Sequence, residues 1–189
     1  MWEQVFTSLS PGFAADEAAL DRAAEALGFA LPASYRAFCC DCGIGLAAAQ
    51  FRIAVPAPFP ASDLPTQAGI IAHSVGAAVT MLEDRGETHR FDVEGGDAAV
   101  IERACFFGVA EDGGFLFWDV SGSGEEYDIW MLAPDLEAIR FGGESLTDFF
   151  SRVTGPSAAL VLGPGTEPLP ARFEGFSEAT LARSAQADT

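Results

Sequence analysis

The chain has 189 residues, 49% of them hydrophobic and 16 of them Phe, which is enough for one domain with a sizeable core. No membrane span is predicted, because no run of about eighteen consecutive apolar residues occurs. No secretory signal is predicted either, because no basic residue precedes Arg22. We therefore expect a cytoplasmic protein. The formal net charge of −18, with Arg as the only basic residue, disfavours nucleic acids and membranes as partners and attracts basic protein surfaces, although it would also serve solubility alone.

The first part of the chain is predicted to be helical. Residues 2–9 have the spacing of a short amphipathic helix, and Asp16 is a suitable N-cap for a second helix over residues 17–27. Gly28 can end that helix in the left-handed conformation, and Pro32 suits the first position of a third helix. We therefore expect helices ahead of any sheet.

Strand signals follow these helices. The predicted elements are, in order, a strand over 51–55, a proline-broken loop, a helix over 69–82 that also resembles a strand, a strand over 104–110, a turn over 111–114, a strand over 115–120, a flexible loop over 121–124, and strands over 127–132 and 136–141. Ser145 then caps a helix that ends at Thr154. This order places one domain in residues 1–155.

Residues 156–189 are rich in Pro and Gly and are predicted to form an extension that is partly docked on this domain. The segment 157–170 does not have the pattern of a helix. Phe173, Phe176 and Leu181 are the side chains that we expect to dock the extension, with Ser177 capping a last short helix.

No catalytic or metal motif stands out. Cys39 and Cys42 form a C-x-x-C, but near a helix C-terminus, where the dipole opposes thiolate formation, and no second paired motif completes a zinc site. A nucleophile elbow and a P-loop are both missing from the sequence. We predict no enzyme activity, no metal and no cofactor, and keep as the weakest alternative a small-molecule pocket near the thiols, His73 and His89.

An acidic stretch is the most distinctive feature of the predicted sheet, because residues 104–139 contain neither Lys nor Arg. An acidic rim around an exposed aromatic side chain suits a protein interface. Each tryptophan in the stretch, taken singly, is more simply a core residue. The candidate partner-binding residues are Glu111, Asp112, Trp118, Asp119, Glu125, Glu126, Asp128 and Trp130.

Three blocks in this order resemble the SUKH superfamily, which includes fungal cell-wall synthesis regulators and many bacterial immunity proteins. The blocks are Glu25-x-Leu27-Gly28-x-x-Leu31-Pro32-x-x-Tyr35-x-x-Phe38, the hairpin FFGVAEDGGFLFWDV over 106–120, and the closing SLTDFFSRV over 145–153. The chain departs from the pattern at Asp41-Cys42-Gly43, where an Asn-Gly pair is common, and residues 57–99 align with no block.

The resemblance implies a single α+β domain with N-terminal helices packed on a mixed or antiparallel sheet of about four to six strands and a closing C-terminal helix. It also implies a non-catalytic binding module. Many bacterial members are antidotes that bind a co-encoded toxin, often a nuclease, and an acidic face would occlude a cleft built to receive phosphates. The alternative within the family is a regulatory scaffold with no toxin partner.

Overall fold

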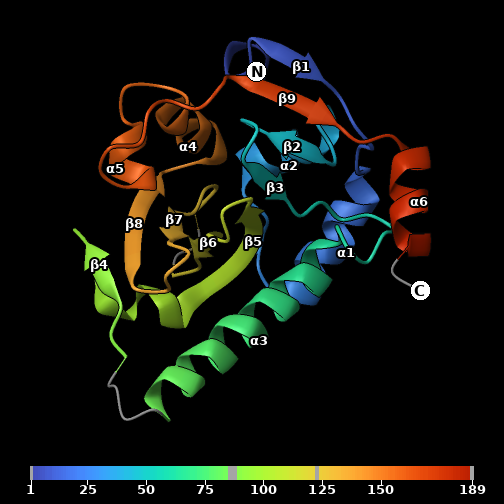
Figure 1. Cartoon of the computed structure of the whole chain (residues 1–189). Coiled ribbons are helices and arrows are strands. Elements are labelled where there is room, and N and C mark those ends of the chain that lie inside the picture. The colour runs from blue at the N-terminus through green and yellow to red at the C-terminus, as the bar shows by residue number, and fades with distance from the viewer. Residues whose placement is uncertain (1, 85–88, 122–123, 188–189) are drawn as a thin grey trace.

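The computed structural model describes residues 2–84, 89–121 and 124–187 (Figure 1). The loop predicted over 121–124 lies partly outside these residues. The described strands are β1 (Ser8–Ser10), β2 (Gly45–Ala47), β3 (Phe51–Ile53), β4 (Asp92–Glu94), β5 (Ala104–Ala110), β6 (Phe115–Asp119), β7 (Ile129–Leu132), β8 (Ala138–Gly143) and β9 (Arg172–Gly175). The helices are α1 (Glu17–Leu27), α2 (Ala33–Asp41), α3 (Leu64–Glu83), α4 (Leu146–Val153), α5 (Ala158–Leu162) and α6 (Glu178–Ala187), with 3₁₀ turns η1 (Trp2–Gln4) and η2 (Ala98–Arg103).

The strands of the described chain form one sheet in the order β1-β9-β2-β3-β5-β6-β7-β8-β4. Every pairing is antiparallel except β1 with β9 and β4 with β8. The predicted α+β class is therefore confirmed, but the sheet has nine described strands rather than four to six. The missed strands are β1, β2, β4 and β9, which span three or four residues each, too few to show an alternating pattern.

Side chains of the sheet alternate between two hydrophobic cores. Leu116 and Trp118 of β6 point into the core that α1, α2, α4 and α5 cover, and Phe117 between them points into the core that α3 and η2 cover. We call these two sides of the sheet the α1 face and the α3 face. This alternation is what a strand buried on both sides requires.

The helical predictions are mostly confirmed. Helix α1 begins after Asp16, whose carboxylate accepts a hydrogen bond from the Ala19 amide at 2.7 Å, and it ends at Gly28 with φ 81°. Residues 2–9 were predicted to be one helix, and this is wrong: a 3₁₀ turn is followed by β1, because pairing with β9 satisfies the backbone instead. Pro32 is the N-cap of α2 rather than its first residue.

The C-terminal extension is part of the sheet. Strand β9 lies between β1 and β2, and Phe173 at its centre is 1% exposed. Segment 157–170 does contain a helix, contrary to prediction: α5 buries Ala158 and packs Val161 into the α1-face core, a tertiary contact that the local pattern does not show. Ser177 caps α6 as predicted, accepting a hydrogen bond from the Thr180 amide at 3.3 Å.

None of the helices in the described ranges has the length and apolar character needed to cross a membrane.

Candidate partner-binding site

The six carboxylates among the eight candidate residues fall into two groups, one at each end of strand β6. Glu111 and Asp112 lie in the turn between β5 and β6, which we call the hairpin tip. Asp119 ends β6, and Glu125, Glu126 and Asp128 precede β7, so these four carboxylates lie at the opposite end, which we call the far end. The five residues of β6 span roughly 16 Å, so the two acidic groups lie at opposite ends of this strand.

Trp118 and Trp130 are core residues, as the simpler interpretation of each predicts, and neither is the exposed aromatic that the candidate interface required. Trp118 is 0% exposed on the α1 face, stacked on Phe107 with ring centroids 4.0 Å apart and edge-on to Tyr35 at 4.9 Å. Trp130 is 7% exposed on the α3 face, edge-on to Phe141. The cause is the strand register, in which Trp118 pairs with Ile129, so that Trp130 necessarily points to the other side.

Glu126 at the far end is a structural residue. Its carboxylate accepts hydrogen bonds from the backbone amide and the hydroxyl of Ser34, both at 2.7 Å. Ser34 is 5% exposed, lies in the first turn of α2 and also accepts a hydrogen bond from the Leu146 amide of α4 at 3.0 Å. The N-cap residue of helix α2 makes no side-chain hydrogen bond. Glu126, which is 92 residues from Ser34 in the sequence, places its negative charge at this helix N-terminus, where the helix dipole favours an anion.

Asp119 and Asp128 experience opposite environments although they lie close together. The Arg103 guanidinium donates two hydrogen bonds of 2.8 Å to Asp119 and lowers the pKa of that carboxyl. Partial burial, followed by the nearby charges of Glu144 and Asp119, raises the pKa of Asp128. Asp119 is therefore engaged within the fold, and Asp128 carries an unfavourable charge.

The hairpin tip is exposed and lies beside a pocket. Glu111 accepts a hydrogen bond of 2.6 Å from the Arg52 guanidinium of β3, and the Asp112 carboxylate accepts one of 3.1 Å from the Gly114 amide, which shapes the turn. Arg52 also lies over the Phe176 ring, with 5.6 Å from the guanidinium carbon to the ring centroid. The tip is thus fixed by β3 and by the segment that follows β9.

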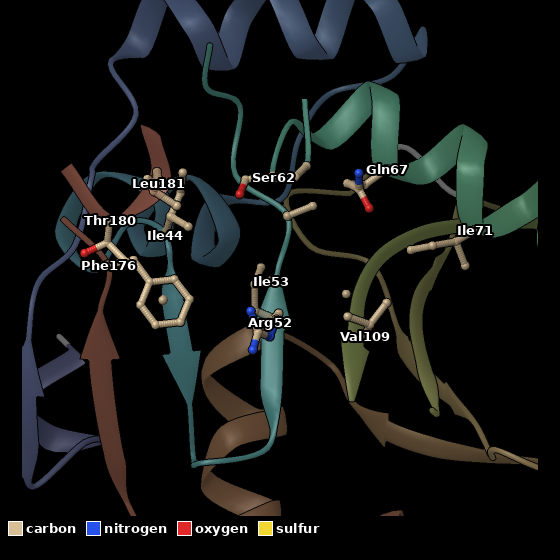
Figure 2. A pocket seen from close by; sticks show the side chains of 14 residues that line it. Ile44, Arg52, Ile53, Ser62, Gln67, Ile71, Val109, Phe176, Thr180 and Leu181 are labelled. Carbon is tan, nitrogen blue, oxygen red and sulfur yellow. The ribbon is translucent and has the colours of Figure 1, made fainter. Parts of the chain in front are cut away.

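The pocket has a volume of about 350 Å³ and opens where β2, β3 and β5 meet the start of α3 and the start of α6. Figure 2 shows Phe176 on one side and Gln67, Ile71 and Val109 on the other, with Arg52 and Ile53 between them. Its lining is mainly aliphatic and aromatic.

Among the elements that the structure describes, no helix covers one part of the sheet on the α3 face. Helix α3 packs its Ile71 and Val75 against β5–β8, and Figure 1 shows β1, β9 and β2 away from it. Leu46 of β2 is in register with Glu174 of β9 and with Arg52 of β3, so the three side chains share this uncovered area. Both charged members are exposed and Leu46 is half-buried. This area adjoins the pocket, because Arg52 lines both.

The thiols do not have the properties of a reactive site. Burial raises the pKa of Cys39, raises that of Cys42 to about 12 and raises that of Cys105 to about 11, so all three thiols are held protonated. Within the described residues, no group of three His, Cys, Asp or Glu side chains has an arrangement that would hold a metal ion.

Comparison with known proteins agrees with the resemblance. The profile of the SMI1 / KNR4 family (SUKH-1) matches residues 14–152, which is well over half of the chain and includes the first two sequence blocks and all but the last residue of the third. A comparison with curated proteins gives no significant match. Strand β9 and helix α6 lie beyond the matched residues, although β9 is an internal strand of the sheet.

Proposed function

Because the chain belongs to the SMI1 / KNR4 family (SUKH-1), we propose that it is a cytoplasmic immunity protein, a non-catalytic module that binds and neutralises a co-encoded toxin through an acidic surface. The family match carries the proposal. The net charge of −18 supports it, since an acidic protein associates rapidly with a basic partner such as a nuclease.

We place the binding surface at the hairpin tip and the uncovered part of the α3 face. Glu111 and Asp112 are exposed there, and the pocket beside them adds a hydrophobic contact to the charged one. The far end is less suitable, because Glu126 and Asp119 already hold Ser34 and Arg103. A surface that combines an apolar centre with a charged rim is the usual arrangement of a protein interface.

The direct test is to co-express the full chain with the product of the adjacent gene. The proposal expects that product to stop growth when it is expressed alone, and expects the chain to restore growth and to co-purify with it in a stable complex. An adjacent product that is harmless alone and forms no complex with the chain would contradict the proposal.

A further inference from the structure

We propose that the pocket beside the hairpin tip receives one large apolar side chain of the partner protein, and that basic residues flank this side chain in the partner. The inference rests on the proposed function and makes it more specific, because it assigns the central contact of the interface. It is carried by the size and lining of the pocket, by its position on the sheet and by the charges around its mouth.

The size of the pocket favours a side chain over a cofactor. Small-molecule sites run from about 300 to 1,000 Å³, and this pocket, at about 350 Å³, is at the lower limit. Ile44, Ile53, Ile71, Val109 and Leu181 give it an aliphatic wall, to which Phe176 adds a ring. A wall of this kind accepts an apolar side chain of leucine or phenylalanine size, and an apolar anchor buried in a pocket is a usual central contact of a protein interface.

The polar groups of the pocket are few. The Gln67 side-chain amide donates to the Pro60 carbonyl at 3.0 Å, which leaves its own carbonyl oxygen as an acceptor. Among the described residues that line the pocket, Arg52 is the only basic one, and Glu111 already matches its charge. The pocket therefore holds no free cation that would select an anionic ligand.

The charges around the mouth favour a basic surround on the partner. Glu111 contacts Arg52 of the lining, and the exposed Glu178 begins α6 between the lining residues Phe176 and Thr180. With the charge of the whole chain at −18, these carboxylates repel an acidic partner and attract lysine or arginine side chains placed around the anchor. An apolar centre within a rim of complementary charge is the expected geometry of the contact.

The test uses two capped pentapeptides, one with leucine and one with serine at the centre of four lysines, added at millimolar concentration to the ¹⁵N-labelled full chain. We expect the leucine peptide to shift the amide signals of pocket residues such as Ile53, Ile71 and Val109, and the serine peptide not to do so. Absence of these shifts with leucine, or equal shifts with serine, would overturn the inference.

Two variants locate the binding. Ala61 is exposed and lines the pocket, so Ala61→Trp should block it and weaken leucine-peptide binding about tenfold or more. The matched control is Ala14→Trp, at an exposed alanine of a second surface hollow, which should leave binding unchanged. Unchanged binding of the leucine peptide to the Ala61→Trp variant would contradict the inference. A second contradicting result would be a free chain that is a dimer and that Ala61→Trp converts to a monomer, because the pocket would then be occupied by a second copy of the chain.

The peptide experiment separates this inference from the proposed function. Full protection from the toxin by the Ala61→Trp variant would overturn the anchor and leave the immunity function intact. A chain that binds the leucine peptide in the pocket but protects against no co-encoded toxin would leave the pocket site intact and contradict the immunity function.

Discussion

The hairpin tip and the far end carry similar carboxylates, yet the fold uses them differently. At the far end, Glu126 holds the start of α2 and Asp119 holds Arg103, so these acids connect parts of the domain. At the tip, Glu111 and Asp112 are exposed, and their contacts are with Arg52 and with the turn itself. Acidic residues close in sequence therefore differ in role: Glu126 and Asp119 are partly buried and hold other segments of the domain, whereas the tip acids are exposed.

The largest effect is expected for Trp118, which precedes Asp119 in β6 and is part of the core. Trp118→Ala should lower the free energy of unfolding by ~3–5 kcal/mol, because it removes a fully buried ring stacked on Phe107. If that variant does not fold, Trp118→Phe should cost roughly 1–2 kcal/mol in urea denaturation followed by circular dichroism. Unchanged stability together with weaker partner binding would contradict the assignment of Trp118 to the core.

The next effect distinguishes a structural carboxylate from its exposed neighbour. Glu126→Ala should lower the free energy of unfolding by roughly 2–3 kcal/mol, since it removes two charge-assisted hydrogen bonds to Ser34. Glu125→Ala is the matched control and should change it by no more than about 0.5 kcal/mol, because, within the described residues, Glu125 is engaged through its backbone carbonyl alone, by the Ala33 amide. Equal losses in the two variants would show that Glu126 has no special role.

A smaller pair of effects has opposite signs. Asp119→Asn should destabilise the protein at pH 7, because the lowered pKa of Asp119 means that its carboxylate stabilises the fold. This loss of stability should vanish as the pH falls through the lowered pKa, which lies below the ordinary pKa of 3.8. Asp128→Asn should stabilise the protein by roughly a few tenths of a kcal/mol at pH 7, because the raised pKa of Asp128 indicates an unfavourable charge. This gain in stability should vanish when the pH falls below 3.8, the ordinary pKa of the carboxyl. Thermal melts across the acid range measure both, and changes of the same sign would contradict the contrast.

The sequence predicted the elements whose signals are local. The cap at Asp16, the stop at Gly28 and the hairpin over 104–120 each depend on neighbouring residues, and the structure confirms them. Strands β1 and β9 pair across more than 160 residues, a relation that no local pattern contains. Their positions in the sheet were for that reason missed.

The candidate site was predicted only in part. The absence of basic residues identified the acidic region, but the capping of α2 by Glu126 joins segments 92 residues apart and leaves no local signal. The alternation of side chains along β6 and β7 contained part of the answer for the tryptophans. With the register that the structure gives, this alternation places Trp118 and Trp130 on opposite faces of the sheet. The pocket is built from five separate elements and was not predicted.

The central claim is that the tip, and not the far end, contacts the toxin, and two double variants with the same net charge test it most directly. Glu111→Gln with Asp112→Asn neutralises the tip and retains hydrogen-bonding groups of the same shape, and Glu125→Gln with Asp128→Asn does the same at the far end. Calorimetric titration with the co-encoded toxin should show about tenfold or greater weakening for the tip variant and less than about twofold for the far-end variant. Equal weakening, or a larger loss at the far end, would contradict the account.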